Sequence, residues 1–195
     1  MSLADTLEAD PFALAERLRA ILSRVLGVPL SVGVAVTGPD ALGHALRAAG
    51  RATESVASWP CPYASLTHSG SVAIAVALPA GARADGLGVD LELDRTLKRG
   101  LARLICDPRE QAWIEDLPEA LQATELLRLW TAKEALYKAD PAQGDAIVAE
   151  YALASPNASS TFGGRAGEDK PAKVVSIRID DATISVAYRA MENAA

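Results

Sequence analysis

The chain has 195 residues, of which 50% are hydrophobic and 23% are charged, as is usual for a globular protein. Its formal net charge of −6 argues against a nucleic-acid-binding protein, because phosphate contacts need a basic face. The longest apolar run, over 72–80, is too short to cross a bilayer, and three acidic residues precede any apolar stretch at the N-terminus. We therefore expect a cytoplasmic protein with no membrane or nucleic-acid partner.

The two cysteines, Cys61 and Cys106, are too few for a disulfide framework. They also lack the spacing that metal ligands have. We expect both to be reduced residues with a structural role.

The first half of the chain predicts a helix followed by strands. Asp10 and Pro11 form a helix-start signal, and Gly27 follows the last apolar residue at helical spacing. In chain order, the pattern predicts a helix over 11–25, a strand over 30–36, a short helix over 39–49, an irregular proline-rich stretch over 58–63 and a strand buried on both faces over 72–78. The Pro- and Gly-containing stretch 79–88 is the best internal boundary.

The second half predicts a similar order of elements. Asp107, Pro108 and Glu110 have the spacing of a capping box, so a helix should begin there. The expected elements are a strand over 89–93, that helix, a longer helix over about 118–139, a loop over 155–171 and a hairpin of 174–179 with 183–188. We predict an α+β fold of two halves, 1–88 and 89–195, within one globular unit.

One strand carries acidic side chains on a single face. Side chains alternate along a strand, so Asp90, Glu92 and Asp94 share the side opposite Val89 and Leu91. Three like charges repel one another unless a cation offsets them, and Mg²⁺ prefers oxygen ligands of this kind. The alternative is an amphipathic strand whose acidic face is simply solvated.

Two further stretches are candidates for chemistry. In the helical stretch WTAKEALYK, Glu134 and Lys138 are four residues apart and share a face, which also suits an ordinary surface ion pair. In SLTHSG, His68 lies among hydroxyls just before a buried strand. It could contact a phosphate, or it could be a hydrogen-bonded structural residue of a turn.

These three stretches, in this order, resemble the motifs of the 4′-phosphopantetheinyl transferase superfamily. SLTHS is similar to its Ser-His motif with Thr67 in place of a serine, GVDLE to its Gly-x-Asp-x-Glu motif, and WTAKEALYK to its Trp-x-x-Lys-Glu-x-x-x-Lys motif. The likeness covers roughly 59–140, and residues 101–116 resemble the helical stretch that the family places between the last two motifs. Trp59-Pro60 further resembles the enterobactin-synthase branch, whereas the Gly-Lys-Pro element of surfactin-type enzymes is missing.

The position of Asp90, which follows the His motif, resembles the larger single-chain type of the family. This type is a 4′-phosphopantetheinyl transferase-like fold with two pseudo-twofold-related halves, each having antiparallel strands packed on helices. The resemblance implies a monomer, because a chain with both halves does not need a partner to complete its site.

The resemblance also implies a reaction. The protein would transfer the 4′-phosphopantetheine group of coenzyme A to a serine of an apo acyl or peptidyl carrier protein, releasing adenosine 3′,5′-bisphosphate. Asp90, Glu92 and Glu134 would hold Mg²⁺ against the diphosphate, and Glu134 and Lys133 would be the catalytic residues, with Glu134 as the best candidate for the base. The implied coenzyme A contacts are Lys133 and Lys138 at the phosphates, His68 and Ser69 near the adenosine 3′-phosphate, and Arg47 and Arg51 on position alone.

The carrier protein is acidic around its serine in most such systems, so a basic surface should receive it. Lys98, Arg99 and Arg103 form the densest basic cluster, although a solvated helix face explains them equally well. Three other functions stay open: a non-catalytic module that binds coenzyme A or a carrier, a metal-dependent hydrolase of coenzyme A or a nucleotide, and a structural protein. The sequence does not distinguish a carrier of fatty-acid biosynthesis from one of secondary metabolism.

Overall fold

Two antiparallel sheets and the helices packed on them make up the described part of the chain, so the predicted α+β class is confirmed. The computed structural model describes residues 2–3, 5–6, 10–36, 44–45, 64–79, 82, 84–95, 100–168 and 170–191. The predicted irregular stretch 58–63 lies outside these residues. So does the predicted helix 39–49 except for residues 44 and 45, which are helical.

The first sheet has three strands in the order β1-β3-β2. They are β1 (Ser31–Val36), β2 (Ala64–Ser69) and β3 (Val72–Ala77). The strands predicted over 30–36 and 72–78 are confirmed, and β3 is buried along its whole length. The expectation that His68 lies in a turn was wrong, because residue 68 is part of β2 and pairs with residue 73 of β3.

The second sheet has five strands in the order β4-β8-β7-β6-β5. They are β4 (Gly86–Leu93), β5 (Tyr151–Leu153), β6 (Ser160–Arg165), β7 (Ala172–Ile179) and β8 (Ala182–Arg189). The predicted hairpin is confirmed as β7 and β8. The predicted loop over 155–171 was wrong in its middle, where β6 forms. Gly163 of β6 lies so close to its neighbours that an added Cβ would be 2.6 Å from a Leu136 methyl carbon, so this glycine serves close packing and not a turn.

Two of the described helices, α2 and α5, begin where the capping residues predict. They are α2 (Pro11–Leu26), α4 (Leu101–Ile105), α5 (Pro108–Glu115) and α6 (Glu119–Lys138), with a 3₁₀ turn at η2 (Val148–Glu150). The Asp10 carboxylate accepts a hydrogen bond from the backbone N–H of Ala13 at 2.9 Å, and the capping box of Asp107 and Glu110 is present in full. No helix in the described ranges is both long enough and apolar enough to span a bilayer.

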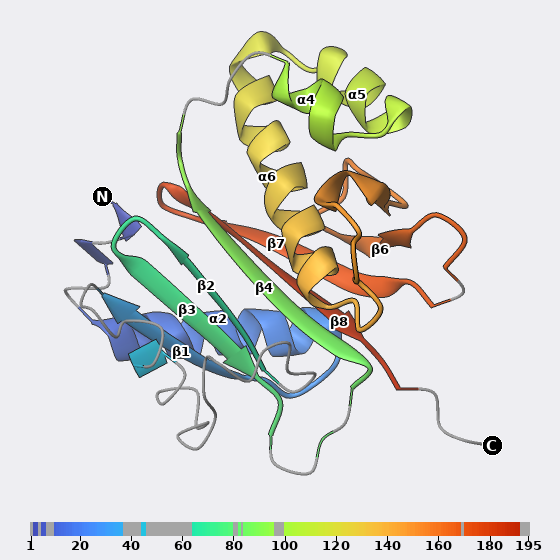
Figure 1. The fold of residues 1–195 in the computed structure, drawn as a ribbon. Coiled ribbons are helices and arrows are strands. Elements are labelled where there is room, and N and C mark those ends of the chain that lie inside the picture. The colour runs from blue at the N-terminus through green and yellow to red at the C-terminus, as the bar shows by residue number, and fades with distance from the viewer. Residues whose placement is uncertain are drawn as a thin grey trace.

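The five-stranded sheet is covered on both faces. One apolar core joins α2 to β1, β3 and β4 and to one face of β7 and β8, and a second joins α4, α5 and α6 to β5 and the other face. Figure 1 shows α6 lying across this sheet, with α4 and α5 at its N-terminal end and α2 behind the strands. Strand β4 contributes its apolar side chains to the first core and also runs beside α6. Its polar side chains therefore lie between the sheet and this helix.

Cys106, at the end of α4, is a buried free thiol within the second core. Burial raises the pKa of this thiol to about 11, so it stays protonated at neutral pH. This agrees with the structural role expected of Cys106, whereas Cys61 lies outside the described residues.

Glycines let α6 approach β4 closely. A Cβ added at Gly88 would overlap the carbonyl oxygen of Ala135, and one added at Gly86 would overlap that of Ala139. Because the obstacle in both cases is helix backbone, it cannot move aside as a side-chain tip can.

We expect Gly88→Ala to lower the free energy of unfolding by about 3 kcal/mol, the upper end of the usual cost of overpacking. Urea denaturation measures this change. Gly164→Ala is the matched control on the same sheet and should cost less, since its added Cβ would overlap only the carboxylate end of Glu168, a side chain that can shift, and would lie at ordinary contact distance from Pro171. A cost at Gly88 no larger than that of the control would contradict the close backbone contact.

Candidate functional site

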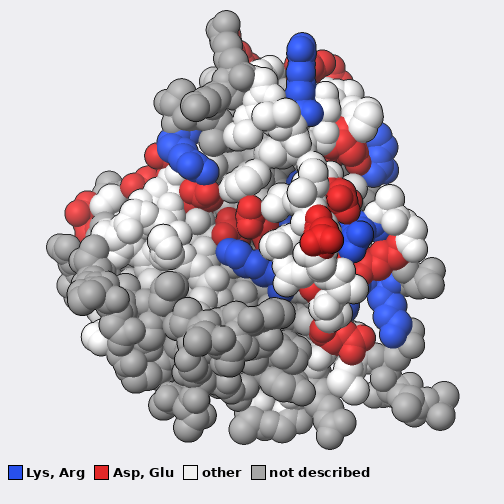
Figure 2. Space-filling model, in the orientation of Figure 1, with Lys and Arg blue, Asp and Glu red and all other residues white. Residues whose placement is uncertain are grey.

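The acidic residues of β4 face the C-terminal half of α6. Helix α6 packs against both β4 and β8, and this brings Glu134 and Lys138 beside Asp90 and Glu92. Figure 2 shows acidic and basic side chains gathered near the middle of this face, where β4 and α6 run side by side in Figure 1. Residues about forty apart in the sequence therefore form one charged cluster.

Asp90 is the most buried member of the cluster, with 6% of its surface exposed. Its Oδ1 atom accepts hydrogen bonds from the Lys138 ammonium at 2.7 Å and from the Thr67 hydroxyl at 3.1 Å. Burial raises the pKa of this carboxyl, and the Lys138 charge opposes that rise. Among the described residues Oδ2 has no hydrogen-bond partner although it is buried.

Glu92 is half-buried and held by neighbours from α6, from β2 and from the segment that follows β4. Its Oε1 atom accepts hydrogen bonds from the indole N–H of Trp130 at 3.1 Å and from the guanidinium of Arg95 at 2.7 Å. The Ser69 hydroxyl is 3.4 Å from Oε2. Trp130, the first residue of the WTAKEALYK motif, thus orients a carboxylate of the second motif.

Glu134 lies close enough to the carboxylates of Asp90 and Glu92 for their charges to change its pKa. Burial is the first cause that raises the pKa of Glu134, and the negative charges of Asp90 and Glu92 raise it further, against the opposing effect of Lys138. A carboxylate whose pKa is raised is a stronger base, which suits a group that must take a proton.

The third acidic residue of the strand face, Asp94, does not join the cluster. It is exposed and forms an ion pair with Arg178 of β7, with Nη1 2.9 Å from Oδ1. The alternation of the strand is correct, but β4 ends at Leu93, one residue before Asp94.

The donor atoms of the cluster fit a hard divalent cation, because they are carboxylate oxygens and one of them, Asp90 Oδ2, is buried and has no partner in the part of the chain that the structure describes. As the side chains are placed, however, no three His, Cys, Asp or Glu residues in the described ranges converge tightly enough to hold an ion. Lys138 occupies the other oxygen of Asp90, and Trp130 and Arg95 both donate to Oε1 of Glu92. The metal-binding role of Asp90, Glu92 and Glu134 therefore stays a prediction.

Lys133 is not where the phosphate-contact prediction requires it. Its ammonium is fully buried, 2.6 Å from the carboxylate of Glu110 in α5, and donates to the carbonyl of Ile105 at 2.5 Å. Lys133 and Glu134 are adjacent on a helix and so point about 100° apart. The structure thus corrects the expectation: the first lysine of the motif lies in the second core, and only Lys138 reaches the acidic cluster.

The other predicted contacts have different positions. His68 is exposed on β2, while Ser69 is partly buried and its hydroxyl accepts the backbone N–H of Leu93 at 3.3 Å. Arg47 and Arg51 lie outside the described residues, as do Lys98 and Arg99 of the predicted basic cluster. Arg103, the remaining member of that cluster, is exposed on α4.

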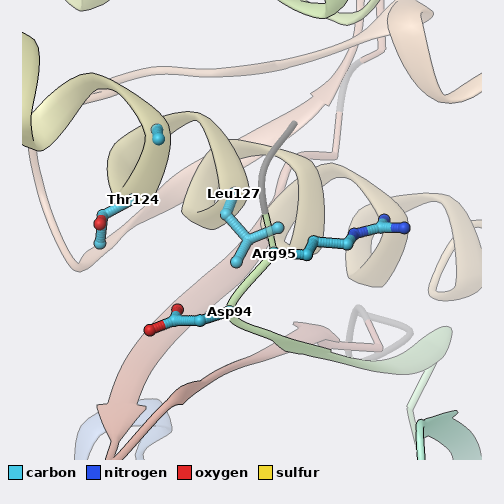
Figure 3. Close-up of a pocket in the computed structure, with 5 residues that line it drawn as sticks. Asp94, Arg95, Thr124 and Leu127 are labelled. Atoms are coloured by element: carbon cyan, nitrogen blue, oxygen red, sulfur yellow. The ribbon is translucent and has the colours of Figure 1, made fainter. Parts of the chain in front are cut away.

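A cleft of about 350 Å³ lies beyond the end of β4, against the N-terminal half of α6. Asp94, Arg95, Ala123, Thr124 and Leu127 line it. Figure 3 shows the Asp94 and Arg95 side chains pointing to opposite sides, with Leu127 between them. Arg95 connects this cleft to the acidic cluster, because its guanidinium pairs with Glu92 at 2.7 Å.

Two contacts of this site were missed from the sequence. The Thr67 hydroxyl donates to Asp90, and the period-two spacing of Ser65, Thr67 and Ser69 was the available signal for a strand with one hydroxyl-bearing face. Glu110 was expected only to cap α5, and no sequence pattern links it to Lys133, 23 residues on.

Comparison with known families agrees with the arrangement of β4 and α6. Residues 86–176, from the start of β4 into β7, match the model of the 4′-phosphopantetheinyl transferase superfamily. This part of the chain belongs to that superfamily, and the family predicted from the three motifs is confirmed. The domain is thus of a transferase type. A search of curated proteins found no significant match.

Proposed function

We propose that the protein transfers 4′-phosphopantetheine from coenzyme A to a serine of an apo carrier protein in the presence of Mg²⁺. The observation that supports this most is the cluster of Asp90, Glu92, Glu134 and Lys138, which combines oxygen ligands, a base and a phosphate-binding cation within a transferase-family domain. The family match supports the class of reaction, and the charges and hydrogen-bonding groups of the cluster support this choice of residues.

In this proposal Asp90 and Glu92, with Glu134, are the residues that would hold the ion. When bound, Mg²⁺ supplies charge neutralisation at the diphosphate and at the leaving adenosine 3′,5′-bisphosphate. Lys138 would donate to a diphosphate oxygen, and the exposed His68 would meet the adenosine 3′-phosphate. The hydroxyl of Ser69 is already engaged with β4, so we favour His68 of these two.

The chemical step needs one proton acceptor. The carrier serine oxygen attacks the phosphorus nearer the pantetheine, and the bond from that phosphorus to the bridging oxygen breaks. The electron pair leaves with adenosine 3′,5′-bisphosphate, and Glu134 takes the serine proton. The raised pKa of Glu134 favours this role.

We further propose that one chain is sufficient. Thr67 and Ser69 of β2 contact the acids of β4 within a single chain, as the larger single-chain type of the family would require. We propose that the carrier protein docks on the side of the molecule that bears the exposed Arg103, because a positive charge there is complementary to an acidic partner.

The test is to incubate the protein with coenzyme A, Mg²⁺ and a panel of apo carrier proteins, and to weigh the carriers intact. We expect at least one carrier to gain the mass of one phosphopantetheine. Free phosphopantetheine with no modified carrier would indicate a hydrolase. Binding of coenzyme A without either product would indicate a non-catalytic module.

Lys138→Ala should weaken coenzyme A binding by about 10- to 100-fold, the effect of losing a charge-assisted hydrogen bond. Calorimetry with coenzyme A and Mg²⁺ measures this change. The matched control is Arg19→Ala, which removes an exposed cation paired with Glu16 on α2 and should leave the affinity unchanged. Equal affinities of the Lys138 variant and the wild type would exclude the phosphate contact.

A further inference from the structure

The free edge of β4 is paired with hydroxyl groups in place of backbone carbonyls. Strand β4 ends its sheet, so the N–H groups on its outer edge need partners. Side chains of β2 supply them. The N–H of Val89 donates to Ser65 Oγ at 2.9 Å, that of Leu91 to Thr67 Oγ1 at 3.2 Å and that of Leu93 to Ser69 Oγ at 3.3 Å. This row of bonds connects the two sheets.

Thr67 has a second bond that Ser65 lacks. Its hydroxyl accepts from Leu91 and has one proton left, and a carboxylate oxygen of Asp90 lies 3.1 Å away. An ionised carboxylate can only accept, so Thr67 must donate to it. Both side chains are 6% exposed. The backbone of β4 therefore orients the hydroxyl, and the hydroxyl in turn orients the carboxylate.

This contact determines which oxygen of Asp90 stays available. Thr67 and Lys138 both donate to Oδ1, and Oδ2 is buried without a partner among the described residues. Threonine suits this task because its branched Cβ restricts rotation about χ1. A hydrogen bond to Oδ2 would prevent that oxygen from binding an ion. Because both donors bind Oδ1, Oδ2 stays available.

We propose that Thr67 is a positioning residue, which holds Asp90 through Oδ1 so that Oδ2 is presented to a divalent cation. This assigns to the threonine of the SLTHS stretch a role toward the acidic cluster and not toward coenzyme A. The inference rests on the proposed function insofar as Asp90 binds an ion. Groups that orient the ligands of a metal typically change its affinity by about 10- to 100-fold when they are removed.

The test measures Mn²⁺ binding to the full chain, without coenzyme A, by electron paramagnetic resonance. Thr67→Val removes the hydroxyl and keeps the branched shape, and we expect it to weaken Mn²⁺ binding by about tenfold or more. Thr67→Ser keeps the hydroxyl and should restore binding to near the wild-type value. If Thr67→Val does not fold, Thr67→Cys replaces it, since a thiol is a weak donor, and binding should again be weakened.

Ser65→Ala is the matched control. It removes a bond of the same kind between the sheets, from the N–H of Val89, but Ser65 has no hydrogen bond to a carboxylate of the described residues. The melting temperature should therefore fall in both Ser65→Ala and Thr67→Val, while the loss of Mn²⁺ affinity should occur only in the Thr67 variant. An equal loss of Mn²⁺ affinity in both variants would show that the effect comes from the hydrogen bonds between the two sheets, and the proposal would be wrong.

Mn²⁺ binding by Thr67→Val equal to that of the wild type would also overturn the inference, even if the wild type modifies carriers. A wild type that binds no Mn²⁺ would overturn it as well. If Mn²⁺ binding depends on Thr67 but no carrier is ever modified, the proposed transferase reaction fails and the positioning role stands. The two proposals can thus fail separately.

Discussion

Glu134→Gln should reduce the rate of phosphopantetheine transfer by about 100-fold or more, the usual contribution of a general base. Glutamine has nearly the same shape but cannot take a proton, and it brings no negative charge to an ion. The half-buried Glu134 has no ion-pair partner among the described side chains, so the substitution leaves no cation without its counter-charge. The fold should therefore persist, which a thermal melt of the variant checks alongside the rate of carrier modification measured by mass.

The control for Glu134→Gln is Glu125→Gln, on the same helix. Glu125 forms an ion pair with Arg128 at 2.6 Å, apart from the acidic cluster. Its substitution should leave the transfer rate close to that of the wild type. A Glu134 variant that modifies a carrier at the wild-type rate would remove Glu134 from the mechanism, whatever its stability.

Lys133→Met should lower the free energy of unfolding by about 3–5 kcal/mol, because it leaves the buried carboxylate of Glu110 without its counter-charge. Both side chains are fully buried, and their atoms are 2.6 Å apart. Glu110 also accepts the backbone N–H groups of Leu153 and Asp107, at 3.0 and 2.9 Å. The pair thus connects α5, α6 and β5, and urea denaturation of the variant measures its contribution.

Two further variants separate charge from shape. Arg19→Met breaks the exposed pair with Glu16 on α2 and should cost far less, because water screens an exposed ion pair. Adding Glu110→Gln to Lys133→Met should recover part of the loss, because the buried charge is removed while hydrogen-bonding capacity remains. If Lys133→Met instead keeps its full stability and loses only coenzyme A affinity, Lys133 contacts phosphate and the buried pair is not structural.

Local signals in the sequence were sufficient for the helix starts and for the family. Capping by Asp10 and by Asp107 with Glu110 depends on residues within one turn, so the pattern alone predicts it, and the structure confirms both. The order of the three motifs likewise predicted the superfamily that residues 86–176 match. The alternation of β4 correctly placed Asp90 and Glu92 on one side.

Contacts between distant elements decided what the pattern could not. Gly163 of β6 looks like part of a turn in the sequence, but in the structure an added Cβ would lie 2.6 Å from a Leu136 methyl carbon and 2.8 Å from the carbonyl oxygen of Ala152. Lys133 and Lys138 belong to one motif, yet α6 directs the first into the second core and the second toward Asp90. Neighbours along a helix point in different directions, so the role of each lysine depended on which elements pack against each side of α6. The sequence by itself determined the family and the helix caps. Only the tertiary structure, which brings β4 against Thr67 and brings α4 and α5 against Lys133, determined the partners of these two residues.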